Sequence, residues 1–116
     1  MTATRKLASL LLLPLLAVVL TGCPKKTTIA DIKKDPARYE NKEVSLRGKV
    51  TQAFGALGQG IYEIDDNTGR LWVLVESTGV PRQGAEVETV GTIVPGVTFG
   101  GRDYGTSLRE KKHRTL

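Results

Sequence analysis

Hydrophobic and polar positions alternate with a period of two from about residue 43 onward. Between residues 44 and 50 every second residue is apolar or glycine and those between are polar, which is typical of a half-buried strand. The same order, with a glycine in the third apolar place, returns in residues 87–93. Glycine weakens a strand unless a bulge or a sharp bend requires it. The two glycine-containing strands therefore predict a sheet that coils tightly on itself.

Three further strands and their turns are expected between and after these two. Residues 61–65 and 71–76 predict a hairpin around the turn Asp66-Asn67-Thr68-Gly69. The fourth strand is expected at residues 86–94 and the fifth at residues 104–109, while Phe54–Gly60 is expected to be a flexible, glycine-rich loop. Five short antiparallel strands with no space for long helices predict an all-β domain, either a small barrel or a sandwich.

A short helix is predicted before the first strand. Thr28 is a suitable N-cap for a helix over residues 29–34, and Asp31 completes a capping-box pattern. Asp35-Pro36 ends or interrupts this helix, because the residue before proline avoids the helical region. Another turn is expected near residues 37–40. The side chains expected to pack this segment onto the barrel are Ile29, Ile32 and Tyr39.

The first 23 residues have the pattern of a secretory signal. Arg5 and Lys6 precede an apolar run over residues 7–20 that is too short to cross a bilayer comfortably. The run ends in Leu20-Thr21-Gly22-Cys23, which resembles the lipobox of bacterial lipoproteins. This resemblance implies cleavage of residues 1–22, acylation of Cys23 and a tether over residues 23–28. The alternative is an ordinary signal peptide or an uncleaved anchor with Cys23 incidental, although a lone free thiol is unusual in an oxidising compartment.

The lipobox resemblance predicts a location in the cell envelope, with the lipid bilayer as the first partner. Pro24 after the cysteine resembles the sorting pattern for the outer membrane, so we expect the outer membrane, facing the periplasm, if the host is Gram-negative. Taking 22 residues from 116 leaves 94, enough for one domain, expected at residues 29–110. Residues 111–116 are expected to be a solvated basic tail.

Charge gives only weak evidence for nucleic-acid binding. Cleavage lowers the formal net charge from +5 to +3, because the removed segment contains two basic residues and no acidic ones. Much of the excess lies at Lys25 and Lys26, where lysines beside a lipid anchor interact with anionic headgroups. The rest lies near the C-terminus, at Arg109, Lys111, Lys112 and Arg114.

Several segments together resemble the OB-fold. They are residues 44–50, the hairpin 62–69 with 71–75, the segment 81–87 and Val90-Gly91. The preceding Ile29, Ile32, Asp35-Pro36 and Tyr39-Glu40-Asn41-Lys42 resemble small bacterial OB-fold lipoproteins. The resemblance implies a five-stranded Greek-key barrel with a short N-terminal helix. One departure is that residues 77–84 are too few and too turn-rich for the helix that many OB-folds have at this point.

The resemblance also implies a binding face on the second and third strands and the loops after strands one and four. Alternation places Tyr62, Ile64, Leu71, Val73 and Val75 inside the barrel, and Ile61, Glu63, Asp65, Trp72 and Leu74 outside. Trp72 is thus a candidate stacking platform. The other candidate ligand-binding residues are Lys49, Arg70, Phe54, Phe99, Arg102 and Tyr104. The alternative is that Trp72 and Leu74 are covered by the N-terminal segment around Ile29, Ile32 and Tyr39.

No catalytic or metal-binding pattern accompanies this face. The run Asp65–Gly69 lacks the spacing and the distal glutamate of a calcium loop, so a plain hairpin turn is the better interpretation. His113 has no partner at a recognisable spacing and is interpreted as a tail residue. We therefore expect no enzyme activity, no cofactor and no metal. The expected function is non-catalytic binding of a protein partner, and the alternative is a single-stranded nucleic acid or an envelope oligosaccharide.

Overall fold

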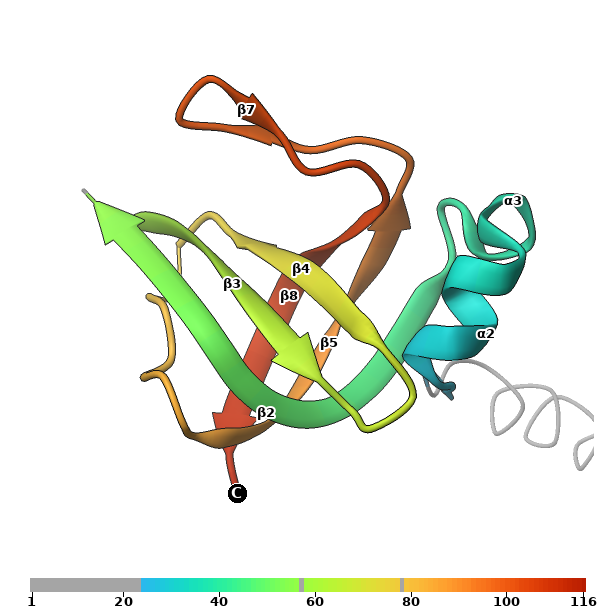
Figure 1. Cartoon of the computed structure of the whole chain (residues 1–116), viewed down its shortest axis with the longest axis horizontal. Coiled ribbons are helices and arrows are strands. Elements are labelled where there is room, and N and C mark those ends of the chain that lie inside the picture. The colour runs from blue at the N-terminus through green and yellow to red at the C-terminus, as the bar shows by residue number, and fades with distance from the viewer. Residues whose placement is uncertain (1–23, 57, 78) are drawn as a thin grey trace, which may run out of the picture.

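The strands pair in an order that closes a barrel (Figure 1). The computed structural model describes residues 24–56, 58–77 and 79–116, so the expected signal peptide and Cys23 lie outside the described residues. Around the barrel the order is β2-β3-β4-β8-β5, and β5 pairs back onto β2. Only the β4–β8 contact among these is parallel. The bounds are β2 Glu43–Ala56, β3 Gln59–Asp65, β4 Arg70–Val75, β5 Glu86–Val94 and β8 Ser107–Thr115. The predicted OB-like, all-β barrel is confirmed.

The long strand β2 serves two neighbours because it bends. Its first half pairs with β5 and its second half with β3, and a bulge lies between Val50 and Gln52. At Gly48 an added Cβ would lie 2.8 Å from the carbonyl oxygen of Asp65, so only glycine allows this close approach. At Gly91 an added Cβ would collide with the backbone of Arg109. The two strand glycines thus mark the tight coiling that the sequence predicted.

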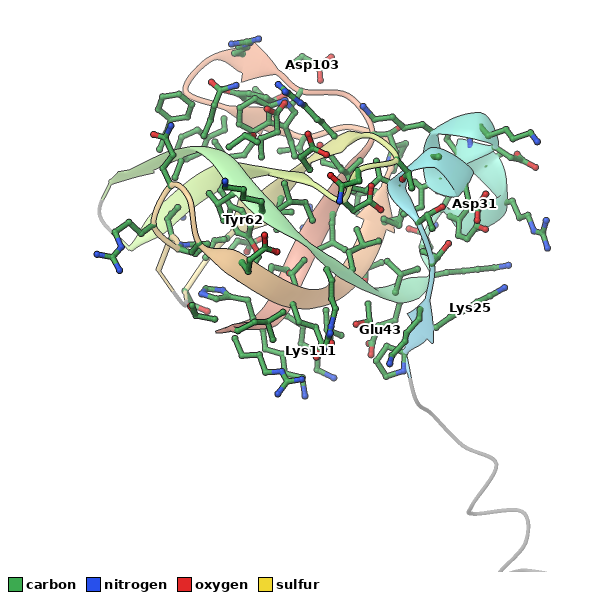
Figure 2. All side chains as sticks on the ribbon, turned by 60° about the horizontal axis from the view of Figure 1, so that its bottom comes forward. Lys25, Asp31, Glu43, Tyr62, Asp103 and Lys111 are labelled. Carbon is green, nitrogen blue, oxygen red and sulfur yellow. The ribbon has the colours of Figure 1, made fainter. Side chains whose placement is uncertain are left out.

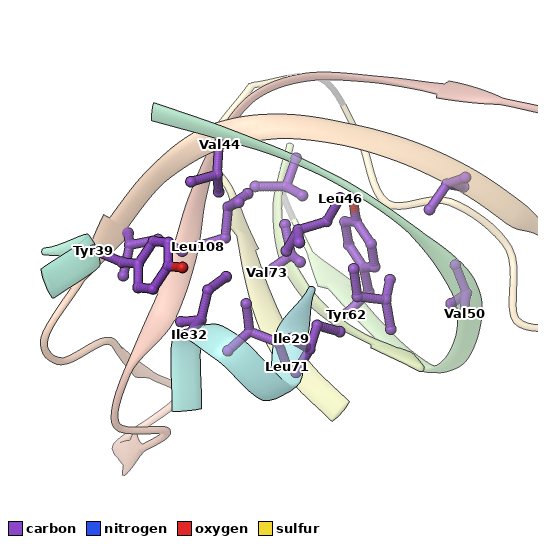
Figure 3. Close-up of a cluster of buried hydrophobic side chains, with 14 residues drawn as sticks. Ile29, Ile32, Tyr39, Val44, Leu46, Val50, Tyr62, Leu71, Val73 and Leu108 are labelled. Atoms are coloured by element: carbon purple, nitrogen blue, oxygen red, sulfur yellow. The ribbon is translucent and has the colours of Figure 1, made fainter. Parts of the chain in front are cut away.

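The barrel interior contains the side chains that alternation placed there. Tyr62, Ile64 and Val73 are fully buried, and Leu71 and Val75 retain 1% of their exposed surface. They pack with Val44, Leu46, Val50, Val87, Ile93 and Leu108 in one cluster (Figure 3). The predicted register of the central hairpin is therefore correct.

The N-terminal segment covers one end of this barrel. It contains β1 (Lys25–Lys26), α2 (Ile29–Lys34) and α3 (Pro36–Tyr39). The Thr28 hydroxyl oxygen accepts a hydrogen bond of 3.2 Å from the Asp31 N–H, which confirms Thr28 as the N-cap. Ile29 and Ile32 are fully buried in the same cluster as Leu71 and Leu108 (Figure 3). The described part of the segment between β4 and β5 contains no helix. Ile29 and Ile32 of α2 instead supply the apolar side chains that close this end of the core.

Three expected boundaries are wrong. The expected loop Phe54–Gly60 is largely a continuation of the β2–β3 hairpin, in which Phe54 pairs with Ile61 and Ala56 with Gln59. The fifth strand begins at Ser107 and continues to Thr115, which pairs with Val87, so residues 111–116 are not a solvated tail. The expected tether is also partly ordered, since Lys25 and Lys26 pair in parallel with the start of β2.

The basic C-terminal residues form a strand by backbone pairing with β5, and exposed ion pairs on the outer side of the barrel accompany this pairing. Lys111 lies 3.9 Å from Glu43, and the Arg114 guanidinium lies 3.1 Å from Glu88. These charged side chains occupy the outer side of β8 while its backbone pairs with β5. A segment whose sequence resembles a polar tail is therefore part of the fifth strand of the barrel.

The connection between β5 and β8 forms a small hairpin of its own. Its strands are β6 (Thr98–Phe99) and β7 (Arg102–Asp103), which extend beside the barrel in Figure 1. Among the described residues, none of the helices has the length and apolar character needed to span a membrane.

Candidate binding face on the barrel

The outer face of the β2–β3–β4 sheet changes from apolar to charged along the strands. Phe54, Ile61 and Leu74 are paired in one cross-strand row at the apolar end. Glu63 and Trp72 are paired in the middle of the sheet. Lys49, Asp65 and Arg70 form the row at the charged end. The alternating side chains of the hairpin thus present two chemically different surfaces on one face.

The β5–β8 connection folds over the apolar end and buries part of it. Val94 and Val97 form a second buried cluster with Ile61, which is fully buried although the sequence placed it on the outer face. Trp72, Leu74, Phe99 and Tyr104 are partly buried against this cluster. The expected alternative, in which the N-terminal segment covers Trp72, is wrong, because Ile29, Ile32 and Tyr39 belong to the interior cluster.

Trp72 lies at the centre of an aromatic patch, which we define as Phe54, Trp72, Phe99, Arg102 and Tyr104. The ring centroids of Trp72 and Phe54 are 6.4 Å apart at an interplanar angle of 27°. The ring of Tyr104 contacts Trp72 edge-on at 4.9 Å, and the Arg102 guanidinium lies 5.0 Å from the Tyr104 ring centroid. Phe54 is 50% exposed. The patch thus combines a fixed aromatic base with an open edge.

Lys49 and Arg70 lie outside this patch, at the charged end of the face. The Arg70 guanidinium is 3.4 Å from Asp65 and 3.8 Å from Glu63. Lys49 lines a neighbouring groove of about 360 Å³ that also contains Arg47, Asp65, Asp66 and Glu86. The structure therefore brings five of the seven predicted ligand-binding residues together, and it surrounds the other two with carboxylates.

A buried polar network that the sequence pattern did not indicate lies on the other side of β3. The Glu110 side chain has no exposed surface, and its carboxylate accepts hydrogen bonds from the hydroxyls of Tyr62 at 2.6 Å and Thr89 at 2.8 Å. His113 Nδ1 lies 2.8 Å from the second carboxylate oxygen, so His113 is not a disordered tail residue. Burial, followed by the negative charge of Glu110, raises the pKa of Tyr62 above its usual range.

This network joins three strands of the barrel, since its members come from β3, β5 and β8. A bulge between Val90 and Gly91 shifts the β5–β8 register, which lets Glu110 and His113 meet although they are three residues apart. The charged and polar residues of this short C-terminal segment did not predict the bulge. Tyr62 and the Glu110 side chain are fully buried, so these two residues of the network act in closing the barrel, while His113 keeps 15% of its side chain exposed.

The turn Asp66–Gly69 connects the hairpin to the N-terminal helix. The Asp66 carboxylate accepts hydrogen bonds from the backbone N–H groups of Ile29 at 2.9 Å and Thr68 at 2.9 Å. The Thr68 hydroxyl oxygen accepts another from the Ala30 N–H at 3.0 Å. Burial alone would raise the pKa of Asp66, but the hydrogen bonds that its carboxylate accepts, first from the Thr68 hydroxyl and then from backbone N–H groups, outweigh burial and lower the pKa. Residues that superficially resemble a calcium loop therefore cap α2.

No cluster of three or more histidine, cysteine, aspartate or glutamate side chains suited to a metal ion occurs within the part of the chain that the structure describes. The carboxylates nearest the candidate face are held by Arg70 and by backbone donors instead. What the face offers a ligand is ring surface, one guanidinium beside it, and a partly neutralised charged row.

Comparison with known proteins supports the fold. No protein-family model matches the sequence. No curated protein is similar to it in sequence. Asparaginyl-tRNA synthetase from Entamoeba histolytica, solved with asparaginyl-adenylate, superposes with a TM-score of 0.62 at 12% identity over 83% of this chain. Asparaginyl-tRNA synthetase from Pyrococcus horikoshii gives a TM-score of 0.60 at 17% identity over 81% of this chain.

The match covers only 24% and 23% of these two synthetase chains, so the likeness concerns one small domain of each. At this identity it shows the fold alone. Together with the strand order and the parallel β4–β8 contact, it supports an OB-like barrel as the fold of this chain.

Proposed function

We propose that this chain is a lipid-anchored, non-catalytic binding protein of the cell envelope that uses its aromatic patch to bind a protein partner. The anchor is acylated Cys23, and the support for it is the lipobox resemblance at residues 20–23. The observation that carries the binding role is the half-exposed Phe54 ring against Trp72. Phe54 and Leu116 are the exposed large apolar side chains of the described residues.

Charge favours a protein partner over a polyanion at this face. Arg70, the basic residue of β4, already faces Glu63 and Asp65. Glu63 also pairs directly with Trp72 across the strands. A nucleic-acid strand needs cations that are free to neutralise its phosphates, whereas a protein interface needs aromatic surface with few uncompensated charges. The face meets the second requirement better.

The partner is tested by affinity purification of the acylated protein from detergent-solubilised host envelopes. The variant Phe54→Asp places a charge on the open edge of the patch, and Gln83→Asp is the matched control on an exposed loop away from it. We expect one envelope protein to co-purify with the wild type and the control in equal amounts and to be lost with Phe54→Asp. Equal recovery with both variants contradicts the proposed role of the patch.

A second candidate function is binding of a single-stranded nucleic acid or an envelope oligosaccharide. The tRNA synthetases with the same fold favour the nucleic acid, and the Arg102–Tyr104 contact beside Trp72 is the kind of stacking surface that such ligands use. Trp72 is the only tryptophan, so its fluorescence reports this face alone. A saturable change with oligonucleotide that weakens steeply as salt rises supports nucleic acid, and a saturable, salt-independent change with glycan fragments supports an oligosaccharide.

A further inference from the structure

The net charge of the mature chain is concentrated at one end of the domain. Residues 24–42, which we call the N-terminal cap, contain six lysines and arginines and three acidic residues. Residues 43–116 contain nine basic and nine acidic residues and are formally neutral. The +3 charge of residues 24–116 therefore belongs entirely to the cap.

Four cations of the cap border one groove of about 660 Å³: Lys25, Lys26, Lys34 and Arg38. They come from β1, α2 and α3, so the fold brings them together from separate elements. Asp31 and Asp35 also line the groove, but none of the four cations forms an ion pair with any residue that the structure describes. Uncompensated cations around a common concavity attract an external anion.

The groove lies beside the predicted anchor. Lys25 follows Cys23 by two residues, which span at most about 7 Å of extended chain. Lys25 and Lys26 are themselves fixed to the barrel, because β1 pairs with Val44 and Ser45 of β2. An acylated Cys23 would thus hold this groove within the headgroup layer of the bilayer, where phosphates of anionic lipids are concentrated.

We propose that the groove of the N-terminal cap binds the phosphate groups of anionic phospholipids and forms a second membrane contact beside the anchor. This proposal rests on the lipid anchor of the proposed function. The two contacts together fix the orientation of the domain, whereas a single flexible attachment would not.

This orientation presents the aromatic patch away from the membrane. The turn Asp66–Gly69 contacts α2, and Leu74, which pairs with Ile61 in the row of Phe54, lies toward the opposite end of β4. Figure 2 shows Lys25 and Asp31 on one side of the barrel and Asp103, next to Arg102 in the sequence, apart from them. Binding of the cap to lipid therefore leaves the patch accessible to a partner.

The test is co-sedimentation of residues 24–116 with vesicles of phosphatidylcholine, alone or mixed with phosphatidylglycerol, at physiological salt. This piece contains every residue of both buried clusters, so its core is complete. In the cap variant Lys25, Lys26, Lys34 and Arg38 are changed to glutamine. In the matched control Lys49, Arg82, Arg102 and Lys112, which also lack ion pairs among the described residues, are changed to glutamine. Both variants lose four positive charges.

We expect the wild type to bind only the vesicles that contain phosphatidylglycerol. The cap variant should bind them about tenfold more weakly or worse, and the control should change by less than about twofold. Equal losses in the two variants would show that net charge alone drives binding, and absence of a preference for phosphatidylglycerol would also overturn the proposal. Displacement from the vesicles by a single-stranded oligonucleotide at low concentration would overturn it by assigning the groove to nucleic acid.

Circular dichroism of each variant separates loss of binding from loss of fold. Should the fourfold cap variant not fold, the double variant Lys34→Gln/Arg38→Gln gives the same comparison against Arg82→Gln/Lys112→Gln. The assay contains neither acyl chain nor partner protein. A negative result in the affinity purification therefore leaves this test intact, and a negative result here leaves the aromatic patch untouched.

Discussion

The two ends of the β3–β4 hairpin differ in how completely their polar groups and apolar side chains are paired or covered by the rest of the chain. At the turn end, Asp66 and Thr68 accept backbone hydrogen bonds from the start of α2, and Ile29 packs against Gly69. At the other end, Phe54 contacts Trp72 on one side and is 50% exposed on the other. Polar groups at the first end are paired within the chain, whereas apolar surface at the second end is left open.

This difference separates stability from binding. A site whose donors, acceptors and side chains are all matched internally has little to offer a ligand, and its residues act on the fold. An aromatic side chain left half in water contributes less to folding and more to association. The predictions below follow from this division.

The largest effect on stability is expected for Ile32→Ala in the cap. Ile32 is fully buried against the barrel core, so its truncation leaves a cavity and should lower the free energy of unfolding by about 2–5 kcal/mol. The matched truncation Phe54→Ala at the open end should cost less than about 1 kcal/mol. Denaturant unfolding of both variants tests the contrast, and equal losses would mean that the open end is part of the core.

The next effect is expected for Asp66→Ala at the turn end. This change removes the acceptor for the N–H groups of Ile29 and Thr68 and should lower the free energy of unfolding by about 1–2 kcal/mol. The chemical denaturation midpoint of the variant measures this loss. Thr68→Val removes the neighbouring acceptor for Ala30 and should act in the same direction, whereas a neutral result for both would contradict the capping role of the turn.

The same aspartate should give a pH-dependent signature. The pKa of Asp66 is lowered in the folded state from its usual 3.8, so its contribution to stability is complete above that value. It is lost as the pH falls through the lower folded pKa, because protonation then removes the charged acceptor. Thermal unfolding of wild type and Asp66→Asn should therefore converge as the solution is acidified, and a difference that grows toward low pH would contradict this sign.

A smaller effect is expected for Tyr62→Phe in the buried network, which should cost about 1 kcal/mol near neutral pH. The pKa of Tyr62 is raised in the folded state above its usual 10.0, so its contribution is complete below that value. Above pH 10 the unfolded tyrosine ionises more readily than the folded one, and the wild type should lose stability that the variant keeps. Unfolding measured on both sides of this pH tests the claim, and parallel curves would contradict it.

The smallest effect on stability is expected for Arg102→Gln in the aromatic patch. The Arg102 side chain is exposed, and its described contact is with the face of Tyr104, so the free energy of unfolding should change by less than about 0.5 kcal/mol. The fluorescence emission spectrum of Trp72, whose ring contacts Tyr104, should change, whereas the unfolding midpoint should stay nearly the same. A large loss of stability would mean that the patch supports the fold.

Alternation and capping chemistry were enough to predict the barrel and the inner face of its central hairpin. Tyr62, Leu71 and Val73 share the interior face that alternation predicted, because successive side chains of a strand point to opposite faces of the sheet. The helix at residues 29–34 was predictable because Thr28 and Asp31 form a local capping pattern. Local patterns of this kind depend only on residues close together in the chain, so they can be recognised in a single sequence.

The cover over the candidate site could not be predicted in the same way. Val94 and Val97 bury Ile61 from a segment more than thirty residues away along the chain, and nothing in strand alternation indicates which loop returns to which face. The basic residues of β8 were misread because their acidic partners also lie far away along the chain, Glu88 at 26 residues from Arg114 and Glu43 at 68 residues from Lys111. The candidate residues of the patch were found because the OB-fold resemblance named the two loops that border the face.

The central claim, that the open end binds a partner while the turn end serves the fold, is tested most directly by site-specific photo-crosslinking. A photoreactive residue is placed at position 54 or, as the control, at position 33 on the exposed side of α2, in the full-length protein expressed in its host cell. The account predicts a discrete protein adduct from position 54 and none from position 33. Protein adducts of equal yield from both positions, or an adduct from position 33 alone, would contradict it.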